Sequence, residues 1–238
     1  MTSTLNDPLR PDDPERPDPS AFERLLQARA SCRGFLDTPV PDAVVRRILV
    51  AAQRTPSWNN VQPWQVIVTR PEATDRLRAA LQAAGADGAG FDIDPPAEYR
   101  GVYLERRRAC GFGLYASVGI ERGDRVASAR QAAENFRLFG APHLALVTTE
   151  RLLGTYGVLD CGAYVNNFML AATASGVASI AQAALAQRSP LLRDWFEIPP
   201  DRQIVCGISF GHADPDHPAN RFRTTRAELE ETVRWVSH

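Results

Sequence analysis

The sequence lacks the features that mark several large classes of protein. No apolar run approaches the roughly 20 residues that a membrane-spanning helix needs, and no basic start followed by an apolar core indicates a signal peptide. The formal net charge is only −1, so no positive excess points to nucleic acid or to an anionic membrane surface. We therefore expect a cytoplasmic protein with neither a membrane nor a nucleic-acid partner.

Cysteine is scarce and scattered along the chain. The four cysteines form no Cys-x-x-Cys pair and no cluster with the four histidines, so neither a metal site nor a disulfide framework is predicted. Reduced thiols in a bacterial-type cytoplasm fit this pattern best.

Apolar residues are plentiful, at 44% of the 238 residues, which is enough for a sizeable core. Residues 1–19 are the exception, because they are rich in Pro, Asp and Arg, and we expect a flexible arm there. Residues 20–238 are predicted to form one domain. The main strands are predicted over 65–69, 143–149 and 203–210, and the main helices over 71–84, 157–175 and 227–236.

The segment Thr55–Trp64 reads Thr-Pro-Ser-Trp-Asn-Asn-Val-Gln-Pro-Trp. Its prolines disfavour helix at the residues before them, so a rigid loop is predicted. Ser57, Asn60 and Gln62 can donate and accept hydrogen bonds, and the tryptophans offer flat apolar surfaces. Such a loop suits a flat heterocycle with a hydrogen-bonding edge, although a polar loop anchored in the core by Trp64 is equally compatible with these residues.

A second polar segment, Arg29-Ala-Ser-Cys-Arg33, comes at the end of a predicted helix. Two guanidinium groups beside a hydroxyl can hold a phosphate, because each guanidinium forms paired hydrogen bonds to phosphate oxygens. Taken alone, residues of this kind are more often ordinary surface arginines.

Residues 98–139 form the region richest in aromatic side chains. Two helices are predicted here, broken around Gly119–Asp124. Their rings either pack between the helices or cover a bound flat ring. Tyr115 and Phe136 are the candidates for contact with such a substrate, so we treat residues 98–139 as a candidate lid.

Together these motifs resemble those of the nitroreductase family, FMN-dependent NAD(P)H oxidoreductases. Pro-Ser-x-x-Asn-x-Gln-Pro-Trp looks like the loop of that family. Arg29–Phe35 looks like its opening Arg-x-Ser-x-Arg-x-Phe signature, and Gly211–Arg226 looks like its closing segment. The aromatic pattern of residues 115–142 is similar to that of the branch acting on nitroaromatics. The resemblance implies an α+β fold with a mixed central sheet, helices on both faces and an intertwined homodimer.

The same resemblance implies the FMN contacts. Cationic and hydroxyl side chains would hold the phosphate and the N1/O2 charge of FMN. The loop Thr55–Trp64, which we call the amide loop, would bind the pyrimidine edge, and backbone N–H groups beyond Gly176 would face the N5 edge. The implied cofactor-binding residues are Arg29, Ala30, Ser31, Arg33, Pro56, Ser57, Asn60, Gln62, Ala181, Gln182, Ala183, Gly211, Arg223 and Arg226. Ala30, Ala181 and Ala183 lack the side chains that many relatives carry there, so only backbone contacts are expected at these positions.

The implied reaction is hydride transfer from NAD(P)H to FMN and then to a nitroaromatic compound, giving a nitroso and then a hydroxylamine group. No catalytic acid or base and no metal is expected. A flavin or quinone reductase, a dehalogenase of the same fold, or a flavin-binding module without turnover would share the same flavin motifs.

Two other patterns in the chain are set aside. Gly207-Ile-Ser-Phe-Gly211 imitates the nucleophile elbow of serine hydrolases, but apolar alternation places Ser209 in a strand that does not turn into a helix. Gly111-Phe-Gly113-Leu-Tyr-Ala116 imitates a dinucleotide-binding fingerprint, but no strand precedes it.

Overall fold

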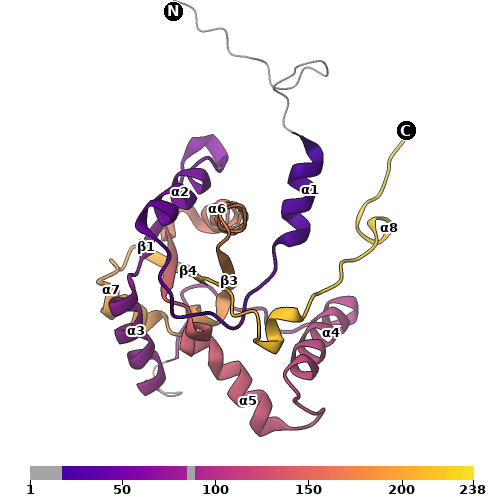
Figure 1. The fold of residues 1–238 in the computed structure, drawn as a ribbon. Coiled ribbons are helices and arrows are strands. Elements are labelled where there is room, and N and C mark those ends of the chain that lie inside the picture. The colour runs from indigo at the N-terminus through magenta and orange to yellow at the C-terminus, as the bar shows by residue number, and fades with distance from the viewer. Residues whose placement is uncertain (1–17, 85–88) are drawn as a thin grey trace, which may run out of the picture.

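The computed structural model describes residues 18–84 and 89–238. The arm expected at residues 1–19 lies outside the described residues up to residue 17, whereas Asp18 and Pro19 already begin the first helix. Asp18 caps helix α1 (Pro19–Ala28) by accepting a hydrogen bond from the backbone N–H of Ser20 at 2.9 Å. Helix α1 buries none of its side chains, and it lies beside helix α6 (Gly154–Ala174), which it contacts (Figure 1).

A four-stranded sheet in the order β1-β2-β4-β3 forms the centre of the fold. Its strands are β1 (Gln65–Val68), β2 (His143–Glu150), β3 (Ala178–Gln182) and β4 (Arg202–Gly211). The α+β class is confirmed. All three pairs of these strands are antiparallel, and in the described residues the parallel pairing expected of a mixed sheet is confined to isolated bridges, one of which joins Ser31 to Ser179 at the β3 edge. Apolar periodicity locates strands and says nothing of their direction, which depends on the path of the connections.

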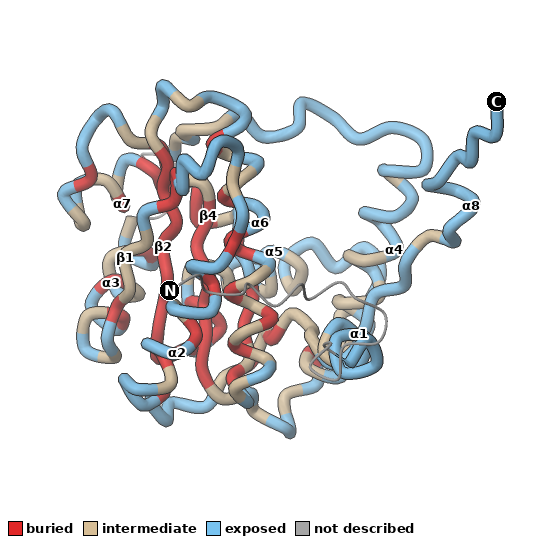
Figure 2. Tube along the Cα trace, turned by 90° about the horizontal axis from the view of Figure 1, so that it is seen from above, coloured by how far each residue is buried: buried red, intermediate tan, exposed pale blue. Residues whose placement is uncertain are grey.

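Helices cover both faces of this sheet, as expected (Figure 2). Strand β2 shows why: Ala145 and Val147 face one hydrophobic core, whereas Leu144 and Leu146 face another. Because both faces are covered, nearly all of β2 is buried. The first core is closed by α2 (Asp42–Ala52) and α6 (Gly154–Ala174), and the second by α3 (Pro71–Ala83) and α7 (Ser189–Phe196).

The candidate lid consists of two helices, as predicted. Helix α4 (Gly101–Ser117) and helix α5 (Arg125–Ala133) are separated by a turn with left-handed glycines at Gly119 and Gly123. Helix α5 continues into the short 3₁₀ segment η2 (Glu134–Gly140). None of the described helices is both long and apolar enough to cross a membrane.

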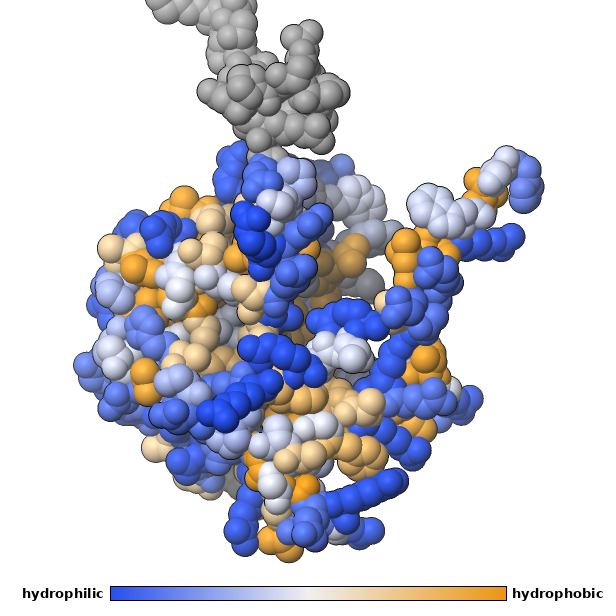
Figure 3. All heavy atoms as spheres, turned by 45° about the vertical axis from the view of Figure 1, so that its right-hand side comes forward, coloured by the Kyte–Doolittle hydropathy of each residue, from blue (hydrophilic) through white to orange (hydrophobic). Residues whose placement is uncertain are grey.

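The helix predicted over 227–236 is the largest error in the element boundaries. Only α8 (Leu229–Thr232) is helical, and the backbone is extended at Val233. Trp235 and Val236 are exposed, so within one chain no core buries the apolar side of this segment. A helix gains most of its stability from such packing, and without it a short helix is marginal. Figure 3 shows the C-terminal segment projecting from the main body.

Candidate cofactor site

The arginine-rich segment Arg29–Arg33 extends the sheet beyond its β3 edge. Ser31 forms a parallel bridge with Ser179, and the backbone N–H of Cys32 donates to the carbonyl of Ser179 at 3.1 Å. The next backbone N–H, that of Arg33, donates to the side chain of Asn220 at 2.7 Å. These hydrogen bonds fix the backbone of the segment against β3 and against the C-terminal part of the chain.

Two hollows follow one another along β3 and this segment. The first, of about 230 Å³, is lined by Ser31, Gly176 and Arg223, among others. The second, of about 250 Å³, is lined by Arg33 and by residues 180–184, among others. The hollows therefore form a strip along β3 in which each has one arginine and several small apolar residues in its lining.

The charges of this strip fit a phosphate-bearing cofactor. In the described part of the chain, none of the guanidinium groups of Arg29, Arg33, Arg223 and Arg226 forms an ion pair with a carboxylate. Burial lowers the pKa of Arg33, but a guanidinium stays charged at neutral pH. Ser179, buried on β3 beside Ser31, has a hydroxyl with no hydrogen-bond partner in the structure. Ser179 lines neither hollow, so the groups that fit a phosphate here are the arginines without carboxylate partners and the hydroxyl of Ser31.

Within this set the four arginines are not equally placed. Arg223 lines the first hollow and Arg33 the second. Arg29 is half-buried, and its side chain lines neither hollow. Arg226 is exposed and donates to the hydroxyl of Thr224 at 2.8 Å. The single chain thus brings two of the four predicted phosphate arginines to the strip.

The end of β3 offers backbone to a flat ring. Ala181 and Ala183 are exposed, whereas the side chain of Gln182 is buried and turned inward, where it donates to the carbonyl of Asn135 at 2.9 Å. Ser209 donates its hydroxyl hydrogen to Gln182 from the middle of the buried strand β4, which is incompatible with a nucleophile elbow. Gly211 lines neither hollow: a Cβ there would lie 2.6 Å from Pro142, so its role is close packing.

The amide loop is rigid and exposed. Asn59, Asn60 and Gln62 all have left-handed backbone, which is unusual for residues other than glycine and costs about 1 kcal/mol each. The backbone N–H of Gln62 donates to the hydroxyl of Ser57 at 2.8 Å, so Ser57 holds the loop itself. Pro56 is exposed beside it. Among the described residues the side-chain amides of Asn59 and Asn60 have no partner, whereas that of Gln62 contacts Gln53 and the carbonyl of Asn60, so the predicted Asn60 is one of two amides free to meet a ligand.

This loop lies far from the strip in the same chain. Its Trp58 packs on Tyr156, with ring centroids 4.2 Å apart, and its backbone N–H donates to Asp160. The first hollow lies at the other end of α6, where Thr173 lines it. At about 1.5 Å per helical residue, Asp160 and Thr173 are roughly 20 Å apart along the axis of α6. One chain therefore separates two groups of residues that the motifs assign to one cofactor.

The aromatic candidates of the lid also differ in position. Tyr115 lines the second hollow, but Phe136 does not: it packs against the second core, with the guanidinium of Arg188 4.8 Å above its ring. In this chain Phe139 lines the hollow. Leu138 and Phe139 have left-handed backbone, so the rings here depart from helical register. Contact of Phe136 with a substrate stays a prediction.

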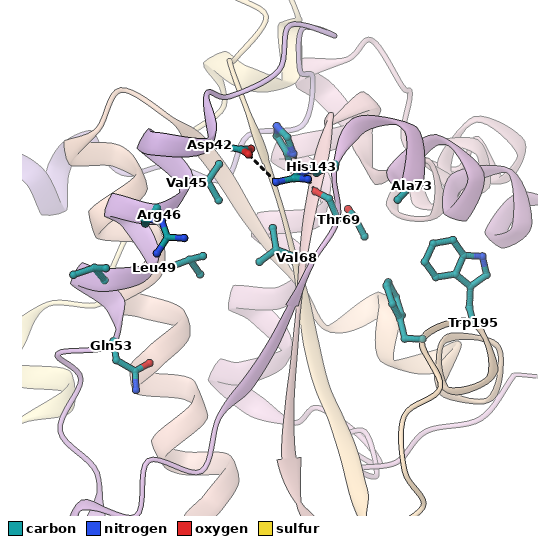
Figure 4. A pocket seen from close by; sticks show the side chains of 13 residues that line it. Asp42, Val45, Arg46, Leu49, Gln53, Val68, Thr69, Ala73, His143 and Trp195 are labelled. Atoms are coloured by element: carbon teal, nitrogen blue, oxygen red, sulfur yellow. Dashed lines mark hydrogen bonds and ion pairs between the residues drawn. The ribbon is translucent and has the colours of Figure 1, made fainter.

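A larger cavity, of about 800 Å³, belongs to neither group of residues. It is an open groove along the edge strand β1, between α2 and the rings of Trp195 and Phe196 (Figure 4). The ion pair of Asp42 with Arg70, 2.7 Å apart, lies at one end of it, and the predicted cofactor residues do not line it. In the described residues no group of His, Cys, Asp and Glu forms a metal site.

Comparison with known proteins assigns the fold and the motifs to one family. A model of the nitroreductase family matches residues 26–212. The chain belongs to the nitroreductase family. The 4-nitrobenzoate reductase of Nocardioides sp. strain LMS-CY is 33% identical over 222 residues, which cover 91% of this chain and 90% of that protein. The nitroreductase NfnB of Mycolicibacterium smegmatis is 37% identical, covering 90% of this chain and 92% of that protein.

Solved structures of the family agree. The FMN-dependent nitroreductase NfnB from Mycobacterium smegmatis in complex with NADPH superposes with a TM-score of 0.87 at 35% identity, over 92% of this chain and 99% of that one. The FMN and NADPH-dependent NfnB from sphigopyxis sp. strain HMH gives a TM-score of 0.85 at 33% identity, over 91% and 99%. The family and the α+β fold expected from the motifs of this nitroreductase are confirmed.

Proposed function

We propose that this nitroreductase-family chain uses FMN to oxidise NAD(P)H and to reduce nitroaromatic compounds. The proposal rests on the strip along β3. There, arginines without carboxylate partners, exposed backbone with small side chains and the ring of Tyr115 line two neighbouring hollows. Relatives similar over nine-tenths of the chain are named for 4-nitrobenzoate reduction and for dependence on FMN and NADPH. The absence of disulfides, with all four cysteines free, is consistent with action in the cytoplasm.

Different residues of the strip bind different parts of FMN. Ser31 and Arg223 bind the phosphate in the first hollow, with Arg29 and Arg226 adding charge, and Arg33 faces the N1/O2 edge, where positive charge stabilises the reduced flavin. Ala181 and Ala183 present backbone to the ring because their small side chains leave it accessible. When bound, FMN supplies the hydride chemistry, so the protein needs no catalytic acid or base of its own.

The amide loop completes this site from a second copy of the chain. Asn60 and Arg33 are both assigned to the pyrimidine edge, yet they lie at opposite ends of α6 in one protomer. A homodimer in which each protomer lends its loop to the site of its partner resolves this separation. Large exposed apolar side chains supply the surface for such a dimer: Phe22, Leu26, Trp58, Val61, Leu152, Tyr156, Leu159 and Trp235.

The lid provides the place for the oxidising substrate. Tyr115, Leu114 and Phe139 line the second hollow opposite residues 180–184, so a flat nitroaromatic ring can lie between them and the flavin. Gln131 adds an amide group at the same hollow, which suits the oxygens of a nitro or carboxylate substituent, whereas the amide of Asn135 already binds the carbonyl of Ala132 and the side chain of Gln182.

The absorbance spectrum of the purified protein tests the proposal first. We expect a yellow protein that releases FMN on denaturation, loses its flavin absorbance on mixing with NAD(P)H, and regains it with a nitroaromatic compound. Flavin that is never reduced would indicate a binding module without turnover. Reoxidation by quinones or free flavin but not by any nitroaromatic compound would support the reductases that share this fold.

A further inference from the structure

Helix α4 of the lid has unusually little holding it in place. None of its 17 residues is buried, and Tyr103 and Phe112 are exposed. The element on which it mainly packs is η5 (Pro218–Arg221), together with the residue that follows it, Phe222. The position of the lid over the second hollow therefore depends on a contact with the C-terminal part of the chain.

The contact is a notch in α4 that receives a ring. A Cβ built on Gly113 would lie 2.6 Å from Cε2 and 3.1 Å from Cζ of Phe222, so only glycine lets the ring come this close. Glycine weakens the interior of a helix, and its presence here is explained by this ring. The same contact accounts for Gly113 within the segment Gly111–Ala116, which imitates a dinucleotide-binding fingerprint.

Phe222 belongs to a short segment that also contacts the cofactor strip. Asn220 binds the backbone of Arg33, and Arg223 lines the first hollow. On the lid side, Leu114 directly follows Gly113, and both Leu114 and Tyr115 line the second hollow. One segment of four residues thus joins the arginine-rich segment Arg29–Arg33, which we call the clamp, to the first hollow and to the lid.

We propose that Phe222 is a positioning residue that sets the lid of the substrate site by fitting into the notch at Gly113. The proposal rests on the proposed function for its meaning in catalysis, but the contact belongs to the chain itself. Because Phe222 lies between Asn220 and Arg223, binding of the FMN phosphate at Arg223 restrains the ring that holds α4.

The other link between α4 and the C-terminal segment is weaker. Arg106 pairs with Glu231 at 3.0 Å, but both side chains are about half exposed, at 43% and 52%. Exposed pairs of this kind contribute little, because water and salt screen them. Arg106→Ala is therefore the matched control for loss of a contact between the same two segments.

Hydrogen exchange of residues 101–117 in the full-length protein, with and without FMN, tests the contact directly. Phe222→Ala is expected to speed exchange of α4 by roughly 10-fold, whereas Arg106→Ala changes it by less than about 3-fold. Gly113→Ala gives the sharpest result. Alanine favours helix over glycine, so a helix that depended only on itself would exchange more slowly, whereas displacement of Phe222 makes it exchange faster.

The double variant Gly113→Ala with Phe222→Leu supplies the rescue. Leucine lacks the two ring atoms that approach Gly113 most closely, so the added Cβ finds room and exchange returns toward that of the wild type. In turnover we expect Phe222→Ala to lower kcat/KM for nitroaromatics roughly 10-fold, mainly through KM, with FMN affinity changed less than about 3-fold.

The outcomes separate the two proposals. A wild-type protein that binds no FMN would overturn the proposed function, yet the exchange of α4 would still decide the role of Phe222. Unchanged exchange in Phe222→Ala, or slower exchange in Gly113→Ala, would overturn the positioning role even in an active nitroreductase.

Discussion

Arg33 and Asn220 are 187 positions apart in sequence and are joined by a hydrogen bond of 2.7 Å from the backbone N–H of Arg33 to the side-chain oxygen of Asn220. The amide nitrogen of Asn220 donates in turn to the carbonyls of Gly34 at 2.8 Å and Asp214 at 2.9 Å. The side-chain oxygen and nitrogen of Asn220 thus together fix the opening motif, Arg29–Phe35, against the closing segment, Gly211–Arg226.

Asn220→Ala is expected to weaken FMN binding roughly 10- to 100-fold, because each buried group left unpaired costs about 1–3 kcal/mol and the clamp loses its fixed backbone. Titration of the apoprotein with FMN measures the effect. Asn220→Asp keeps the acceptor for Arg33 and removes both donors, so an intermediate affinity is expected. Equal affinities of all three proteins would show that the clamp does not depend on Asn220.

Sharing of the site between protomers predicts complementation. If each site takes Arg33 from one copy and Asn60 from the other, a heterodimer of an Arg33→Ala chain and an Asn60→Ala chain has one site with both wild-type residues and one site with both alanines. Half of its sites are therefore intact. Co-expression with two different affinity tags isolates that heterodimer, and its FMN content is expected to exceed that of either variant homodimer. If both groups came from one chain, no intact site would form, and the heterodimer would bind no better than the homodimers.

Tyr115 and Phe136 are expected to behave as opposites, although both are aromatic residues of the lid. Tyr115 faces the second hollow, so Tyr115→Ala removes a stacking surface worth about 0.5–1.5 kcal/mol and lowers kcat/KM for nitroaromatics roughly 2- to 12-fold without loss of FMN. Phe136 packs on the second core, so Phe136→Ala lowers the melting temperature instead, by part of the about 3–5 kcal/mol that a fully buried phenylalanine contributes. Thermal melting beside reaction kinetics separates the two, and a reversed pattern would contradict the placement of these rings.

His143 is a buried neutral imidazole that links three segments. Its Nε2 accepts the backbone N–H of Val40 at 3.0 Å, its Nδ1 lies 3.0 Å from the carbonyl of Thr69, and its ring stacks on Phe210 at 5.1 Å. The proton is therefore on Nδ1 and donates to Thr69. Burial lowers the pKa of His143 below its ordinary value of 6.5, against smaller opposing effects of the hydrogen bond to Thr69 and of the charge of Asp42.

The lowered pKa of His143 predicts acid sensitivity. The unfolded chain takes up a proton below pH 6.5 while the folded protein does not, so the free energy of unfolding falls as the pH decreases from 6.5 toward the pKa of the folded state. The slope contributed by one such group is at most about 1.4 kcal/mol per pH unit. Denaturant unfolding between pH 5 and 8 measures it, with His143→Gln as the variant that cannot titrate. If the free energy of unfolding changed with pH in the same way in the wild type and in His143→Gln, His143 would have the same pKa in the folded and the unfolded state.

Local sequence determined the family, the cofactor motifs and most element boundaries, because each depends on neighbouring residues. Prolines fix the loop around Asn60, apolar alternation fixes β2 and β4, and paired arginines around Ser31 indicate a phosphate. Ser209 was correctly placed in a strand for the same reason, since the sequence after it cannot form a helix.

Tertiary structure alone decided the direction of the strands, the position of Phe139 at the second hollow, and the distance between Asn60 and Arg33. Each of these depends on how segments far apart in sequence pack against one another, and periodicity carries no information on that packing. The same reason explains the C-terminal segment, where the helical pattern of residues 227–236 meets no apolar surface in its own chain and gives only a single turn of helix. The contact of Gly113 with Phe222 was likewise hidden, because a glycine in a helix shows its purpose only when the ring beside it is known.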